Sequence, residues 1–536
     1  MKRIISIISI ILTFCIICLT LSGCGESSSL IRYDISSPAT NLDPQFASSE
    51  TDQMIIHNLF EGLVRQLPNG EIEKALAESW TISEDKLTYT FYLREDAKWR
   101  TGSPVIADDF VFAFQRMFNS LSPSQYSQYY LSLQYAEEIL NDKVSPSLLG
   151  VKALDTYTVE FKLKQPDSSF LEKLSHSSAM PCSRTFFEET RGKYGTTKNS
   201  VASCGPFFLN LWDNEKLYIK KNTLYYDEYS VKTPGVYLWI NRANSKTEEE
   251  NVSLYDLVLQ GKSDSSPVTF EQAEEAKELG YSCLEHIGTV WGLVANPKHS
   301  QLSNDNIRRS FFHSINREEL DGYLSENMVL CDRIIAPEIS LNSEFYTETT
   351  QITPNLYAPE LARSERADGL AEIGHLSLNG MELLVPKDAE IPYFSGMLQQ
   401  MWQRNLSAFV NIVAVEKEEL LRRVENGDYD LAIIPFTASS NSPYDVLSRF
   451  MTEAVANKWN YSNPIYDSFL ENASSTENKK ISANLYSEAE SLLYEDCVVF
   501  PLFSEVSYII FAPNVSGIEI YPYGGMVRFK NAVAMR

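Results

Sequence analysis

Residues 74–118 read KALAESWTISEDKLTYTFYLREDAKWRTGSPVIADDFVFAFQRMF. Every second residue from Leu87 to Leu93 is large and apolar, and this period of two predicts a half-buried strand over 87–93. A Gly-Ser-Pro turn then breaks the chain. Asp108 and Asp109 follow it, where the free N–H groups of a helix start favour carboxylates, and apolar residues recur behind them at helical spacing. The stretch therefore predicts a strand, a turn and a helix.

The order of residues in this stretch, AESW, LTYTF, KW and DDFVFAF, resembles a signature of bacterial extracellular solute-binding proteins, family 5. These are the oligopeptide- and dipeptide-binding lipoproteins of ABC importers. The resemblance implies an α/β protein with a two-lobed periplasmic-binding-protein-like fold (type II, cluster C) and an extra subdomain in lobe one. The stretch itself identifies the family and is not expected to touch ligand.

The chain begins with Lys2 and Arg3, an apolar run over 4–21, and the tetrapeptide Leu-Ser-Gly-Cys ending at Cys24. A basic start and an apolar run make a secretory signal, although the run is also long enough for a membrane-spanning anchor. The cysteine favours the signal, because the tetrapeptide resembles a lipoprotein lipobox. The resemblance implies a signal peptide over 1–23, an acylated Cys24, and a protein lipid-anchored to the outer face of the bacterial cytoplasmic membrane, on its extracellular or periplasmic side.

Composition narrows the classes of partner. The 536 residues carry 46 Lys and Arg against 71 Asp and Glu, a formal net charge of −25. Such a surface repels phosphate backbones, so nucleic acid is not an expected partner.

Five cysteines remain beyond Cys24, without the spacing of a metal site. Cys182 and Cys204 flank one loop-rich segment and form either an extracellular disulfide or two buried thiols.

The resemblance extends along most of the body and implies its division into domains. Asn-Leu-Asp-Pro at 41–44 and Phe-Glu-Gly-Leu at 60–63 match family landmarks, and GTVWGLVAN at 288–296 matches the region near the hinge. A second alternating segment at 158–164 predicts a strand in the same sheet as 87–93. The implied domains are a tether at 24–37, lobe one at 38–287 with an inserted subdomain at about 55–166, lobe two at 288–502, and a return to lobe one at 503–536.

The family places the residues between the first two landmarks at the edge of the ligand cleft. Here these include Ser48, Ser49 and Glu50. Glu50 has a second interpretation, because a helix start also favours a carboxylate.

The second half of the chain contains a βαβ pattern: a strand at 411–415, a helix at 418–424 and a strand at 431–434. Ligands of open α/β sheets gather at the carboxyl ends of the strands, which here is the loop 435–443. The family resemblance points to the same loop. The ligand-binding residues expected there are Phe436, Thr437, Ala438, Ser439 and Asn441.

This loop departs from the pattern of peptide-binding family members, W-x-A-D-Y-x-x-P, in which the aspartate holds the ligand's α-ammonium group. Alignment on Pro443 places Phe436 at the tryptophan and Ser439 at the aspartate. A carboxylate forms a charge-assisted contact with ammonium, whereas a serine hydroxyl offers about 1 kcal/mol. Asp445 and Glu50 are the nearby substitutes. Either the ligand is a peptide held mostly by its backbone, or it is not a free-amine peptide.

No catalytic constellation is present in the sequence. It lacks G-x-S-x-G, H-E-x-x-H, P-loop and G-x-G-x-x-G motifs, and its six histidines are scattered. No enzyme activity, cofactor or metal site is therefore expected.

The resemblance implies a monomeric substrate-binding lipoprotein that captures oligopeptides by closing about a hinge. It would deliver them to the permease and ATPase of an ABC transporter. Two alternatives stay open at this point. One keeps the fold but binds an oligosaccharide, a peptidoglycan fragment or a metal complex. The other is a surface interaction or sensory lipoprotein that works without a permease.

Overall fold

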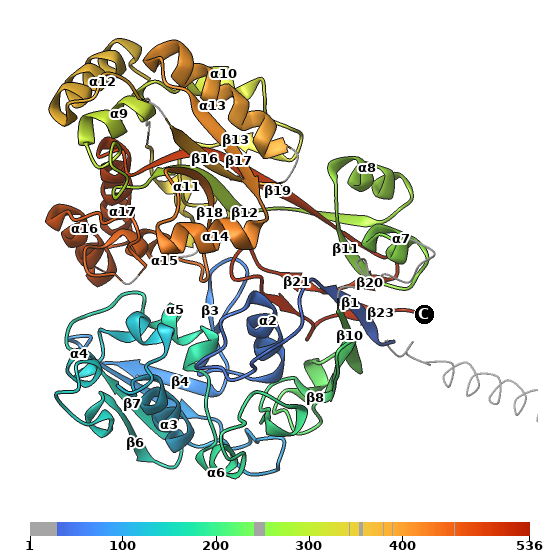
Figure 1. Ribbon diagram of the computed structural model, residues 1–536. Helices are drawn as coiled ribbons and strands as arrows, with labels where there is room; N and C mark the ends of the chain where they lie inside the picture. The colour runs from blue at the N-terminus through green and yellow to red at the C-terminus, as the bar shows by residue number, and fades with distance from the viewer. Residues whose placement is uncertain are drawn as a thin grey trace, which may run out of the picture.

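The computed structural model describes residues 29–240, 252–341, 344–352, 357–378, 380–387, 390–454, 456–476 and 478–536. These residues form two lobes, one above the other in Figure 1. Cys24 and the signal peptide predicted at 1–23 lie outside the described residues. In the ranges that are described, no helix has the length and apolarity needed to cross a membrane.

Lobe one holds one hydrophobic core, to which the start and the end of the chain both contribute. Its strands run in the sheet orders β1-β10-β9-β8 and β4-β5-β7-β6, with β1 parallel to β10. The strands are β1 (Ile31–Ile35), β2 (Val64–Gln66), β3 (Ile72–Lys74), β4 (Ala77–Ile82), β5 (Thr88–Leu93), β6 (Val151–Asp155), β7 (Thr158–Lys162), β8 (Phe207–Trp212), β9 (Lys216–Lys221), β10 (Gly235–Ile240), β20 (Val515–Ser516), β21 (Glu519–Ile520), β22 (Val527–Arg528) and β23 (Val533–Ala534). The helices are α2 (Glu50–Leu59), α3 (Ala107–Met117), α4 (Ala136–Leu140), α5 (Phe170–Leu174) and α6 (Arg184–Glu189).

The signature stretch folds as predicted. Strand β5 buries Phe91 and Leu93 on one face and pairs with β7, so the strand predicted at 158–164 joins the same sheet. Helix α3 begins just before the predicted carboxylates. Asp109 accepts hydrogen bonds from the Ile106 N–H (3.0 Å) and from Trp99 Nε1 (2.8 Å), which ties the helix start to the preceding turn. The stretch is thus a structural core and lies away from the cavity described below.

Lobe two is built on the sheet β11-β19-β12-β18-β16-β17, with β13 also paired to β19. Its strands are β11 (Ser265–Val268), β12 (Ser282–Ala295), β13 (Met328–Leu330), β14 (Ser340–Leu341), β15 (Glu344–Phe345), β16 (Met381–Pro386), β17 (Val410–Val415), β18 (Leu431–Thr437) and β19 (Val499–Phe511). Its helices are α9 (Asp305–His313), α10 (Arg317–Asp321), α11 (Tyr346–Thr349), α12 (Pro359–Ile373), α13 (Glu390–Leu406), α14 (Lys417–Asn426), α15 (Pro443–Leu447), α16 (Pro464–Ser475) and α17 (Lys479–Glu495). Helices α7 (Leu254–Leu259) and α8 (Phe270–Glu278) lie beside the far ends of β12 and β19 (Figure 1).

The predicted βαβ unit is present as β17, α14 and β18. Gly427 ends α14 with φ 72°, a left-handed conformation that glycine adopts without strain. Strands β17 and β18 are both parallel to β16, which lies between them in the sheet. Just beyond the carboxyl end of β18, Ser439 Oγ lies 2.8 Å from the hydroxyl of Tyr129 in lobe one, so this end of the strand faces lobe one.

Strands β12 and β19 form the long connection between the lobes. They pair antiparallel from Ser282 opposite Phe511 to Val294 opposite Val499. Pro501 stands within β19 although proline cannot donate to a strand ladder. It lies where the register shifts between Trp291 and Gly292, so the irregular pairing accommodates it.

Cys182 and Cys204 are two buried thiols rather than a disulfide. Burial raises the pKa of Cys182 to about 12, so its thiol stays protonated at neutral pH. The sequence had left both interpretations open, and the structure selects the thiols.

A buried ion pair holds the core of lobe two, and nothing in the sequence pattern predicts it. Glu490 of α17 is fully buried and accepts from Arg333 Nη2 (2.9 Å), the Tyr494 hydroxyl (2.6 Å) and the Ile334 N–H (3.0 Å). Replacing Glu490 by alanine leaves the buried Arg333 guanidinium without its counter-ion. We therefore expect a loss of about 3–5 kcal/mol in the free energy of unfolding. Calorimetry should show this as a lowered melting temperature.

The matched control is Glu319→Ala, which breaks the exposed pair of Glu319 with Arg404 (2.8 Å). An exposed pair contributes at most about 1 kcal/mol, so this variant should melt close to the wild type. Equal melting temperatures for the two variants would contradict the role assigned to Glu490.

Candidate ligand-binding cleft

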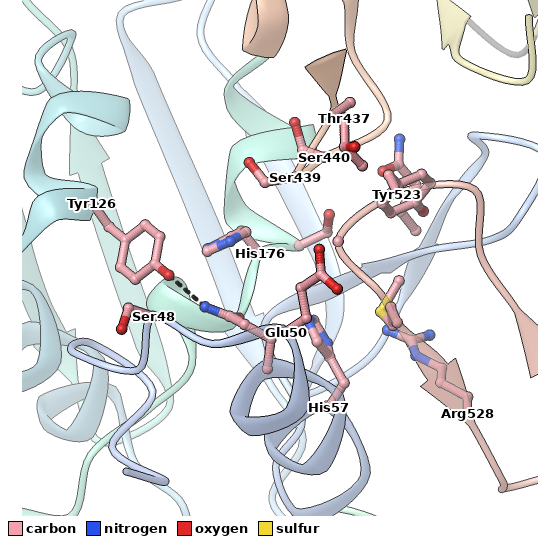
Figure 2. A pocket seen from close by; sticks show the side chains of 16 residues that line it. Ser48, Glu50, His57, Tyr126, His176, Thr437, Ser439, Ser440, Tyr523 and Arg528 are labelled. Atoms are coloured by element: carbon pink, nitrogen blue, oxygen red, sulfur yellow. Dashed lines mark hydrogen bonds between the residues drawn. The ribbon is translucent and has the colours of Figure 1, made fainter. Parts of the chain in front are cut away.

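A cavity of about 230 Å³ lies between the lobes. Lobe one contributes the first turns of α2 and a C-terminal loop at 521–528, and lobe two contributes the loop that follows β18 (Figure 2). Side chains far apart in the sequence therefore meet in one space.

Helix α2 presents Glu50 to the cavity. Ser49 caps the helix, because its hydroxyl accepts from the Asp52 N–H (3.1 Å), and Asp52 turns away to bind the Thr40 N–H (2.8 Å). Glu50 points into the cavity (Figure 2). No hydrogen bond or ion pair joins its carboxylate to any residue of the described ranges. Glu50 is thus the first residue of α2 and also faces the cavity, as the two interpretations of the sequence expected of its position.

The lobe-two loop places Thr437, Ala438 and Ser439 on the opposite wall. Behind them, Asp445 accepts from the Ser439 N–H (2.6 Å) and from its hydroxyl (2.8 Å). Arg449 Nη2 also donates to Asp445 (3.2 Å). The Asp445 side chain is only 4% exposed. Its carboxylate is thus engaged by the protein and does not face the cavity.

The sequence-predicted residues divide into two groups. Ser48 lines the cavity with Glu50, Thr437, Ala438 and Ser439, whereas Ser49, Phe436 and Asn441 are not part of its lining. Phe436 is buried and stacks on Phe450, with ring centroids 6.0 Å apart. The side-chain oxygen Oδ1 of Asn441 accepts from the Ser340 N–H (2.7 Å), which fixes the loop within lobe two.

Two histidines that looked isolated in the sequence both line the cavity. Burial lowers the pKa of His176 to about 4. Burial, and to a lesser degree the Arg528 guanidinium, holds the pKa of His57 well below its usual range. Both imidazoles are therefore neutral at pH 7 and add no positive charge to the cavity.

The C-terminal loop completes the site and was not identified from the sequence. It adds Tyr523, Met526 and Arg528 to the lining. Its turn needs glycine, because Gly524 (φ 60°) and Gly525 (φ 57°) are both left-handed. A Cβ on Gly524 would lie 2.9 Å from the Ser439 carbonyl oxygen, and the Gly524 N–H donates to Ala438 (2.9 Å). The loop thus touches lobe two directly.

Further contacts join the lobes beside the cavity. The Tyr129 hydroxyl, on the 3-10 helix Gln125–Tyr130, lies 2.8 Å from Ser439 Oγ and donates to Asp445 Oδ1 (2.9 Å). The Ser168 N–H donates to the Ser474 carbonyl (2.5 Å), and Lys173 Nζ lies 5.0 Å from the centroid of the Tyr444 ring. The structure is therefore a closed arrangement of the two lobes.

Comparison with known proteins agrees with this architecture. Curated relatives include the periplasmic oligopeptide-binding protein OppA of Haemophilus influenzae, 25% identical over 89% of this chain and 88% of its own length. A dipeptide-binding protein of Lactococcus lactis is 26% identical over 96% of both chains.

Among solved structures, OppA of Listeria monocytogenes bound to peptide has a TM-score of 0.77 at 24% identity, covering 95% of this chain and 99% of that one. The pheromone receptor PrgZ also has a TM-score of 0.77, at 23% identity, over 95% of this chain and all of that one. At these identities the likeness shows the fold, which is the two-lobed fold predicted from the sequence.

The family itself is shown by a match over residues 71–458, more than half of the chain, to the family model described as "Bacterial extracellular solute-binding proteins, family 5 Middle". The match contains the signature stretch, most of lobe two and the loop after β18. The chain therefore belongs to the family 5 bacterial extracellular solute-binding proteins.

Proposed function

We propose that this protein is the substrate-binding lipoprotein of an ABC importer, and that it captures short peptides between its lobes without catalysing a reaction. The observation that carries the proposal is the cavity lined from both lobes. A ligand that contacts both walls favours the closed arrangement over an open one, and this differential binding is what drives closure.

The proposal includes the domain boundaries, the site and the partners expected from the sequence. The proposed lobes are 38–287 and 288–502 with a return at 503–536. Two large hydrophobic cores, one built mainly from residues 31–238 with 512–534 and the other mainly from residues 290–503, support this division. The exact bounds differ, because β1 already belongs to the sheet of lobe one and β11 to the sheet of lobe two. Ser48, Glu50, Thr437, Ala438 and Ser439 are the proposed ligand contacts. Cys24 is the proposed lipid anchor, which would hold a monomer on the outer face of the membrane beside its permease and ATPase.

The size of the cavity argues for a short ligand. Its volume of about 230 Å³ lies below the roughly 300–1,000 Å³ of typical ligand pockets. The names of the relatives, oligopeptide- and dipeptide-binding proteins, support a peptide. Native mass spectrometry of the purified protein tests this, because a retained peptide should appear as a defined mass increment.

A second candidate, a non-peptide solute such as an oligosaccharide, a peptidoglycan fragment or a metal complex, is favoured by one observation. The position of the family's ammonium-binding aspartate is Ser439, and the nearby Asp445 is engaged within lobe two. A retained mass that is not a peptide would select this candidate.

Glu50 is the carboxylate available for a peptide's ammonium group. Glu50→Gln should weaken the binding of a random tripeptide pool about tenfold, because a charge-assisted hydrogen bond contributes about 1.5–3 kcal/mol. Binding of the N-acetylated pool should not change. Calorimetric titration measures both. Glu418→Gln, in the exposed first turn of α14, is the control and should bind as the wild type does.

A loss of affinity for both pools alike in Glu50→Gln would mean that Glu50 shapes the cavity rather than binding ammonium. Unchanged affinity for both pools would remove Glu50 from the site.

Restoring the family's aspartate at position 439 should destabilise the protein in a pH-dependent way. The Ser439 hydroxyl lies 2.8 Å from Asp445 Oδ1, so Ser439→Asp places two carboxylates against each other and raises a folded-state pKa above its unfolded value of about 3.9. A raised carboxyl pKa disfavours the folded state once the group ionises. The melting temperature of Ser439→Asp, relative to wild type, should therefore fall as the pH rises from 4 to 7.

The control is Ser439→Asn, which adds similar bulk without charge and should show no pH-dependent loss. The double variant Ser439→Asp with Asp445→Ser restores a single carboxylate and should recover stability at pH 7. A Ser439→Asp protein as stable as wild type at pH 7 would show that the two carboxylates do not meet.

A further inference from the structure

Arg528 is a cation that forms no ion pair within the described part of the chain, although it lies on β22 opposite Glu519 of β21. Its Nε is buried and has no hydrogen-bond partner. Arg65, which lines a neighbouring cavity with Arg528, instead pairs with both Glu61 (3.4 Å) and Glu73 (3.1 Å). The guanidinium of Arg528 rests 5.3 Å from the centroid of the Tyr521 ring.

Two further polar atoms that line the same cavity also lack a partner. Tyr523 is only 5% exposed, and among the described residues neither its hydroxyl nor His57 Nδ1, both of them buried, has a hydrogen-bond partner. Tyr523, His57 and Arg528 all line the cavity between the lobes (Figure 2). Burial raises the pKa of Tyr523 well above its usual range, so its hydroxyl keeps its proton and can donate.

These three groups can all donate a hydrogen bond. A guanidinium only donates, a phenol hydroxyl can donate, and a neutral imidazole donates from Nδ1 in one of its two tautomers, the one that an anion would select. Buried polar groups left unpaired are unfavourable. A carboxylate would satisfy them, because its two oxygens accept from the planar fork of an arginine and have lone pairs left for a phenol and an imidazole.

The charges of the cavity also fit such a ligand. Among the described residues that line it, the charged side chains are Glu50 and Arg528, and they do not form an ion pair with each other. An unpaired carboxylate and an unpaired guanidinium in one small cavity are complementary to a zwitterion.

We propose that Arg528, Tyr523 and His57 form an anion subsite, between α2 and the C-terminal return of the chain, that binds the terminal carboxylate of a short peptide, while Glu50 binds its ammonium end. The subsite rests on the proposed function only for the identity of the ligand. It places the charged contacts to both peptide termini on α2 and the C-terminal return, and leaves uncharged contacts to the loop after β18.

The test compares a random tripeptide pool that lacks Asp and Glu with the same pool carrying C-terminal amides. Calorimetric titration of the wild type should give at least about tenfold tighter binding of the free acids, because amidation removes the charge that the arginine binds. Arg528→Gln should lose that preference by binding the free acids about tenfold more weakly and the amides as before. Arg422→Gln, on the exposed face of α14, removes the same charge elsewhere and should keep the preference.

A second, milder variant tests the subsite independently in case Arg528→Gln does not fold. Tyr523→Phe removes one hydroxyl and should weaken free-acid binding about three- to tenfold without changing amide binding.

A third pool of amidated tripeptides containing Asp or Glu distinguishes the terminal carboxylate from an acidic side chain. Tighter binding of this pool than of the plain amides by the wild type, lost in Arg528→Gln, would assign the subsite to an acidic side chain and overturn the terminal-carboxylate assignment. Equal binding of free acids and amides by the wild type, unaffected by Arg528→Gln, would overturn the subsite.

Failure of the proposed function gives a different result, in which the wild type binds none of the pools. Inorganic phosphate and citrate then probe the subsite by thermal shift. A rise in melting temperature of the wild type that is absent in Arg528→Gln would support an anion subsite that serves a non-peptide solute. No rise with either anion would overturn the subsite as well.

Discussion

The antiparallel pairing of β12 with β19 is the constraint on which the rest of the structure depends, because it carries the chain between the lobes. The two strands stay hydrogen-bonded from one lobe to the region beside the other. Their register shifts between His286 and Thr289, and Glu338 accepts from the Ile287 N–H (2.5 Å) at that irregularity. The connection is therefore tied by backbone pairing and still contains two points where the pairing is not regular. Such points are where a two-strand connection can bend without breaking its ladder.

This connection also determines which residues can reach the cavity. Beyond β19 the chain returns to lobe one, where Asn58 of α2 donates to the Val527 carbonyl (2.7 Å) and accepts from the Phe529 N–H (3.0 Å). The 521–528 loop is thereby fixed against the helix that carries Glu50 and His57. Three walls of the cavity thus come from α2, the β18 loop and the C-terminal return, and the lobe that supplies charge is lobe one.

Local patterns predicted the fold well because they report burial. The alternation at 87–93, the apolar face behind Asp109 and the βαβ order of β17, α14 and β18 each follow from which side chains meet the core. The rule on strand carboxyl ends likewise located Thr437 and Ser439. Phe436 shows the limit of that rule, since it is still within β18 and its side chain alternates into the core of lobe two. Tyr523 and Arg528 had no local signal, because their place beside His57 depends on a contact between residues more than 460 positions apart.

Because the two histidines of the cavity are neutral, Glu50 and Arg528 determine the charge that a ligand meets there. His176 accepts from the Ser178 N–H (3.2 Å) and packs against Tyr126 at a tilt of 52° between the ring planes (4.8 Å between centroids), so it is held as a packed, uncharged ring. Its pKa of about 4, and the pKa of His57, which burial holds well below its usual range, leave both imidazoles of the cavity neutral at pH 7. A histidine that gained charge there would oppose Arg528 as a second cation and would compete with the ligand's ammonium for Glu50. Because the imidazoles stay neutral, recognition of a zwitterion by Glu50 and Arg528 needs no change in the protonation of its surroundings as the lobes close.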